Sequence, residues 1–342
     1  MAKRPTMHDV AAAAGVSQAT VSLVLGRKRS NRVSDETAER VVAAATNLGY
    51  RTNVHAKVLR EGHSRMIGII GSEIATAPFA GEMILGAQTQ AWESGHVLLT
   101  VDTAGDTSLA KAAIDMMMSY GVVGIIYAAM YHQAVTLPTA LAGIRTVCAN
   151  ARDSSGATTS IIPDEFRGGV EAAETLLEAG HRRIAMINIA EEGSTLPAAA
   201  GRIAGFTQTL AQGGVPIPEN RIGHGLGNFE SGHEWTRTLM AREEPPTAIF
   251  CANDRTALGA YQALSALGLS VPDDVSIIGF DDQSLLGPLF EPPLTTFQLP
   301  LKHLGRLAVE EILNPSSAGP RTIPVHCPIQ TRASVAQPKE QA

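Results

Sequence analysis

Residues 7–25 read MHDVAAAAGVSQATVSLVL, and this stretch decides how the N-terminal part of the chain folds. A first helix is predicted after Thr6, which can cap it, because apolar residues recur at helical spacing at Met7, Val10, Ala11 and Ala14. Gly15 and Val16 then turn the chain. Ser17 can cap a second helix, whose helically spaced positions are Thr20, Val21, Val24 and Leu25. The stretch therefore predicts two short helices joined by a tight turn.

A third helix is expected to begin after Ser34 and to end at Gly49, with Val41, Val42, Ala45 and Leu48 facing inward. Three such helices make a small all-α headpiece of residues 1–50. Its second helix can enter the major groove of DNA, which is about 12 Å wide. The residues expected to face DNA are Ser17, Gln18, Ala19 and Ser22. The alternative is a generic three-helix domain whose basic residues are incidental.

The charge of the chain is divided unevenly between its two ends. The whole chain has a net charge of −6, yet residues 1–65 hold eleven Lys or Arg and five Asp or Glu, a net +6. The remaining residues hold 16 basic and 28 acidic side chains, a net −12. The basic excess includes Arg27, Lys28, Arg29 and Arg32, directly after the second helix. A basic head on an acidic body predicts that the head binds a polyanion.

After residue 65 the sequence changes to apolar runs that alternate with helical segments. The apolar runs are Met66–Ile70, Val97–Val101, Val122–Tyr127, Thr146–Ala149, Ile184–Ile189, Ala248–Ala252 and Val275–Phe280. Unbroken apolar strands between helices predict parallel sheets that are covered by helices on both faces. Because about 270 residues exceed one ordinary hydrophobic core, we expect two α/β lobes.

The sequence contains no recognisable catalytic or cofactor-binding motif. Gly223, Gly225 and Gly227 do not complete a dinucleotide fingerprint, and His233-Glu234 lacks the second histidine of a zinc protease. Cys148, Cys251 and Cys327 each lie in an apolar run, which predicts buried thiols. We therefore expect no enzyme activity, no metal and no cofactor. With no long apolar span and no signal peptide, a cytoplasmic location is expected.

Residues 7–25 resemble the headpiece of the LacI/GalR family of bacterial transcription regulators. The resemblance continues through the third helix to Asn53, Ala56, Leu59, Arg60 and Gly62, the pattern of that family's hinge helix, so residues 51–65 are expected to form a hinge helix and linker. In the family this helix forms on DNA, and a leucine at the place of Leu59 enters the minor groove. Alternatively, Leu59 packs on the following domain. The resemblance implies DNA contacts by Thr6, Ser17, Gln18, Ala19, Thr20, Ser22, Arg29, Asn53, Lys57 and Leu59.

The resemblance extends to about Pro338, through stretches such as ANDRTALG at 252–259 and VSIIGFDD at 275–282. It implies a two-lobed, periplasmic-binding-protein-like α/β sensor domain at 66–336, crossed three times by the chain, followed by a tail at 337–342. The first lobe is expected at about 66–162 and 296–322. The second lobe is expected at about 163–292 and 323–336.

Ligands of open α/β sheets bind beyond the carboxyl ends of the strands, which is where Asn253 and Asp281 fall. By position, the resemblance implies that Arg202, Asn253 and Asp281 contact an effector and that Phe229 stacks on it. Further contacts are expected from the first lobe: Ser72, Phe79, Tyr131 and Asn150. The alternatives are that Asn253 or Asp254 only caps a helix, that Asp281 only forms a turn, and that Arg202 is a surface charge.

These features predict a homodimeric DNA-binding regulator, most simply a repressor, whose affinity for double-stranded operator DNA is controlled by a small effector. Two heads are needed because one short helix reads only a half-site. A sugar or sugar derivative is the expected effector, and a purine or other non-sugar metabolite is the alternative. A ligand-binding module without a DNA role would lack the basic head, and a sugar-processing enzyme would need a catalytic pair.

Overall fold

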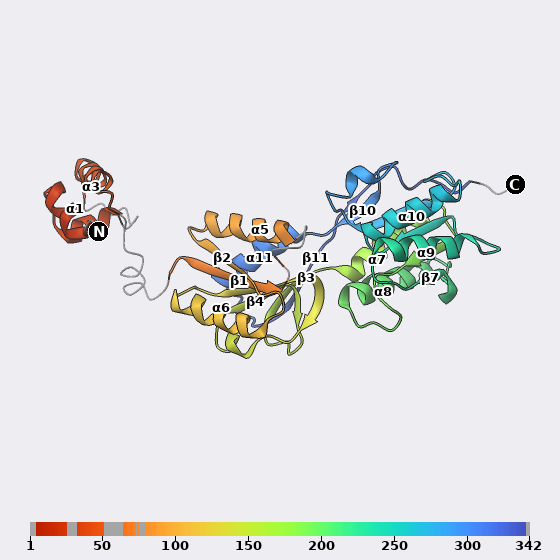
Figure 1. The fold of residues 1–342 in the computed structure, drawn as a ribbon, viewed down its shortest axis with the longest axis horizontal. Helices are drawn as coiled ribbons and strands as arrows, with labels where there is room; N and C mark the ends of the chain where they lie inside the picture. Colours follow the sequence, from red (N-terminus) through yellow and green to blue (C-terminus); the bar gives the residue numbers. More distant parts are fainter. Residues whose placement is uncertain (1–4, 26–32, 51–63, 73, 75–79, 340–342) are drawn as a thin grey trace. The chain divides into compact units, whose positions relative to one another are not determined.

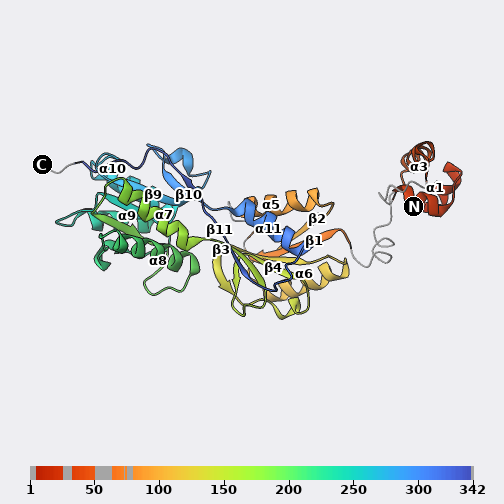
Figure 2. The same cartoon turned by 180° about the vertical axis from the view of Figure 1, so that it is seen from behind.

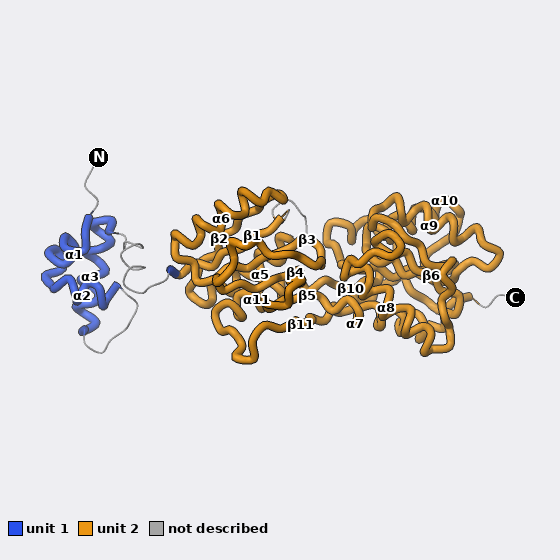
Figure 3. Tube along the Cα trace, turned by 90° about the horizontal axis from the view of Figure 1, so that it is seen from below, with its two compact units in different colours: residues 1–64 blue, residues 65–342 orange. Residues whose placement is uncertain are grey.

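The computed structural model describes residues 5–25, 33–50, 64–72, 74 and 80–339. The chain divides into two compact units, Met1–Ser64 and Arg65–Ala342 (Figure 3). Each unit has a hydrophobic core of its own. Within the described ranges, no helix is long and apolar enough to cross a membrane.

The first unit contains the three predicted helices, α1 (Met7–Ala14), α2 (Gln18–Leu25) and α3 (Asp35–Asn47). Thr6 and Asp9 cap α1 reciprocally, while the Ser17 hydroxyl accepts a 3.1 Å hydrogen bond from the Thr20 amide at the start of α2. The turn between these helices passes through Gly15 at a φ of 65°, a left-handed conformation that glycine adopts without strain. Val10, Val21 and Val41, one from each helix, are fully buried where the helices meet.

The first lobe of the second unit is built on a parallel six-stranded sheet with the spatial order β11-β5-β4-β3-β1-β2. Its strands are β1 (Met66–Ser72), β2 (Val97–Asp102), β3 (Ile125–Val135), β4 (Thr146–Asp153), β5 (Thr159–Pro163) and β11 (Thr322–Val325). Helices α5 (Ala80–Glu93) and α11 (Leu301–Leu313) cover one face of the sheet, and α6 (Thr107–Ser119) covers the other (Figure 1).

The second lobe repeats this layered arrangement with a sheet of order β12-β10-β9-β8-β6-β7, in which only β12 is antiparallel to its neighbour. Its strands are β6 (Ile184–Ile187), β7 (Ile222–Gly223), β8 (Ala248–Cys251), β9 (Ser276–Asp281), β10 (Thr295–Gln298) and β12 (Ile329–Gln330). Helices α7 (Glu165–Glu178) and α8 (Pro197–Gln212) pack on one face, and α9 (Phe229–Met240) and α10 (Asp254–Ala266) on the other (Figure 2). Three short 3₁₀ helices lie at Thr139–Leu141, Glu219–Arg221 and Gly287–Leu289.

Two of the expected lobe boundaries differ from the sheets. Strand β10 pairs with β9 and belongs to the second lobe, although residues from 296 onward were expected in the first. Strand β11 pairs with β5 and belongs to the first lobe, although residues from 323 onward were expected in the second. Both strands are only four residues long, so lateral pairing rather than their own pattern decides their sheet.

Candidate functional site

Helix α2 presents a short polar surface on the headpiece. Ser17, Gln18 and Ala19 are exposed, whereas Val16 and Val24 pack against the headpiece core. Thr20 and Ser22 are half-buried, and the Thr20 hydroxyl lies 2.9 Å from that of Ser17. The start of α2 is therefore the part of this helix that is open to a binding partner, as in a helix whose N-terminal residues enter a groove.

Thr6, another residue expected to contact DNA, has its hydroxyl engaged in capping α1. It donates to Asp9 Oδ2 at 2.7 Å and accepts from the Asp9 amide at 3.3 Å. The remaining expected DNA contacts lie outside the described residues: Arg29, Asn53, Lys57 and Leu59. Phe79, expected near the effector, also lies outside them.

A cavity of about 190 Å³ lies between the two lobes, beyond the carboxyl ends of strands from both sheets. Its apolar lining includes Met130, Ile189, Leu196, Leu226 and Leu299. Its polar lining is Tyr131, His132, Asn150, Glu165, Arg202, Asn253, Arg255 and Asp281. A cavity with an apolar body and a few converging polar groups is typical of a small-molecule site.

The structure brings five of the expected effector residues to this cavity: Tyr131, Asn150, Arg202, Asn253 and Asp281. Ser72 does not reach it and instead lines a separate pocket with Thr103 and Tyr127.

Phe229 is also absent from the described lining of the cavity, and Leu226 lies there instead. Phe229 is the first residue of α9, and its ring stacks one turn along that helix on His233, with the ring centroids 6.2 Å apart. The Phe229 side chain therefore lies against its own helix, and Leu226 is the residue of this segment that lines the cavity.

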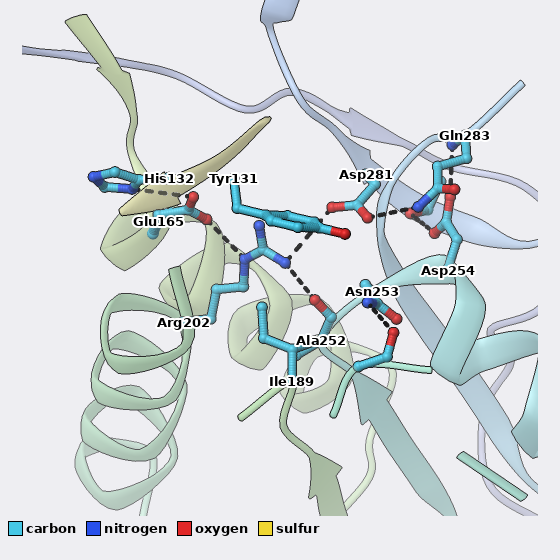
Figure 4. Close-up of polar contacts among 12 residues, drawn as sticks. Tyr131, His132, Glu165, Ile189, Arg202, Ala252, Asn253, Asp254, Asp281 and Gln283 are labelled. Carbon is cyan, nitrogen blue, oxygen red and sulfur yellow. Dashed lines mark hydrogen bonds and ion pairs between the residues drawn. The ribbon is translucent and has the colours of Figure 1, made fainter. Parts of the chain in front are cut away.

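Arg202 is the central cation of the cavity, and it is 3% exposed, so it is not a surface charge. Its Nε donates to Glu165 Oε2 at 2.7 Å, and its Nη1 donates to the carbonyl of Ala252 (Figure 4). Nη1 also lies 3.6 Å from Asp281 Oδ1, and the guanidinium carbon lies 3.7 Å from the centroid of the Phe280 ring. The carboxylates therefore balance the charge of this guanidinium, Phe280 covers one of its faces, and two of its nitrogens donate hydrogen bonds to the protein.

Close packing of α7 on α8 brings Glu165 to Arg202. A Cβ on Gly205 of α8 would lie 2.0 Å from the carbonyl oxygen of Phe166 on α7. A Cβ on Gly169 of α7 would lie 2.2 Å from the carbonyl oxygen of Arg202. Only glycine permits this approach, and the two buried side chains meet because of it. Burial favours the neutral acid, but Arg202 and a hydrogen bond with His132 hold the pKa of Glu165 below its usual value.

Three residues close to Arg202 or lining the cavity have unusual backbone conformations. Asp281 has a φ of 111°, and Asp282 and Asn150 each have a φ of 54°, although none is glycine. Asp281 Oδ2 accepts a 2.8 Å hydrogen bond from Gln283 Nε2. Such strain persists only where surrounding contacts enforce it, and it is often found at binding sites.

Asn253 and Asp254 follow β8 and serve mainly to organise the site. Asn253 caps α10 by accepting from the Thr256 amide at 2.8 Å, and its Nδ2 donates to the Gly227 carbonyl at 2.8 Å. Asp254 is more deeply buried and accepts from Thr296 Oγ1 at 2.6 Å and from the Gln283 amide at 2.7 Å. Burial raises the pKa of Asp254 and of Asp281, and the charge of Asp281 raises that of Asp254 further.

Two contacts join the lobes across the cavity. His132 of β3 places Nδ1 at 3.3 Å from Glu165 Oε1 of α7. Tyr131 of β3 places its hydroxyl at 3.4 Å from Arg255 Nη2 of α10. A ligand in the cavity would touch both partners of each contact, because all four residues line it.

Sequence reasoning missed His132, Glu165 and Arg255. Glu165 had a usable signal, because it follows the apolar strand β5 just as Asp281 ends β9. His132 had no such signal. The strand was expected to end at Tyr127, but β3 continues to Val135 and includes His132. In the described part of the chain, no group of three or more His, Cys, Asp or Glu could hold a metal, and the three cysteines are buried and unpaired.

The fold and the cavity define a class of protein, in which a helix-turn-helix headpiece is joined to a two-lobed binding domain. Comparison with known families agrees: residues 6–53 match "Bacterial regulatory proteins, lacI family", and residues 173–335 match "Periplasmic binding protein-like domain".

Individual relatives match nearly the whole chain. It is 36% identical over 306 residues to the HTH-type transcriptional regulator DegA of Bacillus subtilis (strain 168), covering 88% of both proteins. It is 32% identical over 339 residues to the HTH-type transcriptional repressor PurR of Klebsiella pneumoniae (strain 342), covering 97% of both. The chain therefore belongs to the LacI family of bacterial regulatory proteins and is a DNA-binding transcription regulator, not an enzyme.

Solved structures show the same architecture. The Lac repressor dimer bound to operator and the anti-inducer ONPF has a TM-score of 0.77 and 27% identity, covering 98% of this chain and 100% of that one. The complex of the transcriptional regulator CelR with cellobiose has a TM-score of 0.66 and 28% identity, covering 97% and 100%.

Proposed function

We propose that this regulator is a repressor whose affinity for operator DNA is set by a small molecule bound in the cavity between the lobes. The observation that carries the proposal is that cavity itself, which is lined by Arg202 and Asp281 from the second lobe, by Tyr131 from the first, and by apolar side chains. A ligand that contacts both lobes favours one arrangement of the lobes over another. Coupling of this kind is typically about 1–3 kcal/mol, enough to change operator occupancy several-fold or more.

A sugar or sugar derivative is the ligand class that the lining suits best. Asp281 and Glu165 can accept hydrogen bonds from hydroxyl groups, and Tyr131 can donate or accept one. Leu226 and Ile189 offer apolar surface to the carbon face of a ring. The similar CelR structure contains cellobiose, which supports the same class here.

Operator DNA is bound by the headpiece in this proposal. The contacts come from Ser17, Gln18, Ala19, Thr20 and Ser22 at and in α2. Thr6 before α1, and Arg29, Asn53, Lys57 and Leu59 later in the sequence, complete the proposed set. The protein acts in the cytoplasm as a homodimer, because one α2 reads only a half-site. The exposed apolar side chains Leu85 and Trp92 of α5 and Val97 of β2 support dimerisation, as does the dimeric Lac repressor structure.

Asp281→Asn tests the effector half of this proposal. Asparagine tolerates the positive φ of this position but lacks the carboxylate charge. With an operator selected from random DNA, we expect unchanged DNA affinity in the variant and an effector response weakened by about tenfold or more. Fluorescence anisotropy of labelled operator, titrated with a sugar panel, measures both quantities.

Ser72→Ala is the matched control, because Ser72 lies in a different pocket and its loss leaves the effector response intact. An Asp281→Asn variant that responds to the effector as the wild type does would contradict the proposed site.

A purine is the second candidate effector, because the PurR relatives match 97% of the chain. Tyr131 could stack on a purine ring, and Asp281 could accept from its N–H groups. Adding purine bases to the titration panel separates the two candidates. If only a purine weakens or strengthens operator binding, the effector is a purine and not a sugar.

A further inference from the structure

The cavity between the lobes holds its central cation already paired. Arg202 Nε is 2.7 Å from Glu165 Oε2, and Asp281 Oδ1 is 3.6 Å from Nη1 on the other side. The side chains of Arg202 and Glu165 are both 3% exposed, so water screens this pair little. An incoming anion would therefore meet a guanidinium flanked by two carboxylates.

The charges that line the cavity cancel among the described residues. Arg202 and Arg255 are the two cations, and Glu165 and Asp281 are the two anions. Arg255 contacts the Tyr131 hydroxyl at 3.4 Å, and its charge partly offsets the rise in the pKa of Asp281 that burial causes. A phosphate or carboxylate loses its hydration when it enters the cavity. No net positive charge is left there to compensate the free-energy cost of this dehydration.

His132 adds an independent constraint on the ligand. Glu165 is ionised and can only accept, so the imidazole proton lies on Nδ1, 3.3 Å from Glu165 Oε1. In the tautomer that carries its proton on Nδ1, Nε2 is an acceptor, and within the described part of the chain this buried atom has no hydrogen-bond partner. A ligand group that satisfies Nε2 must donate a hydrogen, as a hydroxyl or N–H does and an ionised carboxylate does not.

We propose that Glu165 determines which charge an effector can carry. By pairing with Arg202, Glu165 makes the cavity selective for an uncharged, hydrogen-donating molecule and excludes phosphate esters and carboxylates. Glu165 acts through Arg202 as a specificity-determining residue. His132 accepts a hydrogen bond from a donor group of the ligand. This inference rests on the effector site proposed above and names the chemical class that the site accepts.

The charge filter can be tested with inorganic anions, without knowing the effector. Glu165→Gln keeps the size of the side chain and removes its charge, which leaves a net positive cavity. At about pH 8 and constant ionic strength, we expect phosphate and sulfate to raise the thermal midpoint of Glu165→Gln. We also expect them to bind this variant at least about tenfold more tightly than the wild type.

Glu171→Gln is the matched control for this titration. Glu171 is on the same helix and also pairs with an arginine, because Arg167 Nε lies 2.7 Å from its Oε1, yet it does not line the cavity. Its variant should respond to phosphate as the wild type does. An equal response of Glu165→Gln and Glu171→Gln would overturn the proposal.

A second arm uses the wild-type chain alone and decides the question even if Glu165→Gln does not fold. Matched pairs are titrated by calorimetry: ribose and ribose 5-phosphate, glucose and glucose 6-phosphate, adenosine and adenosine monophosphate. We expect no anionic member to bind more tightly than its uncharged partner. A phosphate ester that binds the wild type more tightly than its uncharged partner would show that the filter does not exist.

Failure of the proposed function gives a different pattern of results. If no small molecule alters operator binding, the regulatory proposal fails, yet the phosphate response of Glu165→Gln still reports on the filter. If a sugar phosphate releases operator from the wild type, the regulatory proposal stands and the charge filter fails.

Discussion

Arg202 shows how the chemistry of one residue depends on the groups around it. An arginine at the edge of a cleft is usually available to bind an anion, through a planar fork of donors. Here Glu165 takes Nε, the Ala252 carbonyl takes Nη1, and the Phe280 ring covers one face. The residue type alone suggests an anion site, and the three partners turn it into a neutral, pre-ordered wall of the cavity.

Asp254 is the residue whose ionisation should dominate the pH dependence of stability. Burial, and then Asp281, raise the pKa of this carboxyl from its ordinary value of 3.8 to about 7 in the folded chain. A raised folded pKa contributes stability that is fully present below the unfolded pKa and is lost as pH rises through the folded pKa. The wild type should therefore lose stability between about pH 5 and pH 8.

Asp254→Asn cannot ionise, so it should lose less stability than the wild type over that range, by about 1–3 kcal/mol. Urea unfolding followed by circular dichroism at both pH values measures the difference. Asp274→Asn serves as a contrast, because Asp274 is solvated and hydrogen bonds with Ser270 lower the pKa of its carboxyl to about 2. If Asp254→Asn and the wild type have parallel pH profiles, Asp254 is not the controlling group.

At the scale of elements, pairs of helices with small residues in contact position the site. Gly205 of α8 and Gly169 of α7 let two backbones approach until side chains would collide with carbonyl oxygens. The same arrangement recurs where Gly232 of α9 meets Thr256 of α10 and Gly259 meets Phe229. Close helix pairs beside a parallel sheet therefore hold the side chains of the cavity at fixed distances from one another.

Gly205→Ala should force α7 and α8 apart, because the added Cβ would lie 2.0 Å from the Phe166 carbonyl oxygen. We expect a loss of about 1–3 kcal/mol in the free energy of unfolding. Gly81→Ala is the control: Gly81 lies in α5, a Cβ added there would have no atom within 4 Å, and the variant should gain about 0.5–1 kcal/mol from the better helix former. Urea unfolding measures the midpoint of each variant. If both midpoints shift in the same direction, close packing at Gly205 is not the cause.

At the scale of the whole molecule, positive charge is concentrated in the N-terminal part of the chain. Residues 1–65 carry a net +6 and the remainder a net −12. The three-helix unit has its own core around Val10, Val21 and Val41, and the two-lobed unit has separate cores on both faces of each sheet. Because DNA repels the acidic body, the basic head provides the attraction.

This division predicts how binding depends on salt and on the presence of the head. The full chain should lose operator affinity by about a thousandfold or more between about 50 and 200 mM salt, because phosphate contacts release counterions. Residues 65–342 alone should sediment as a dimer, respond to the effector and ignore DNA at every salt concentration. A flat salt dependence of the full chain, measured by fluorescence anisotropy, would refute the assignment of DNA binding to a basic head.

Local patterns were enough to predict the elements that carry their own signals. The caps at Thr6, Ser17 and Ser34 and the apolar spacing of Val10, Val21 and Val41 give all three headpiece helices. Long apolar runs such as Val275–Phe280 predict the central strands, since strands buried on both faces are apolar throughout. Strands β10 and β11 were assigned to the wrong lobes because the sequence of a four-residue strand does not indicate which sheet it joins.

The candidate site was predicted in part, for the same physical reason. Arg202, Asn253 and Asp281 follow recognisable motifs, and all three line the cavity. Phe229 and Ser72 were also expected there, but the Phe229 ring stacks on His233 and Ser72 lines a separate pocket. Glu165 and His132 meet across a sequence separation of 33 residues, a distance over which no local pattern reports contact.

Short-range information in the chain specified the headpiece, the alternation of strands and helices, and the uneven charge, because helix periodicity, capping and burial act over a few residues. The tertiary structure decided the membership of the edge strands, the pairing of Arg202 with Glu165 and the neutral charge of the cavity. Those features arise from contacts between distant segments at low dielectric, where a displacement of an ångström or a single buried carboxylate changes which ligand can bind.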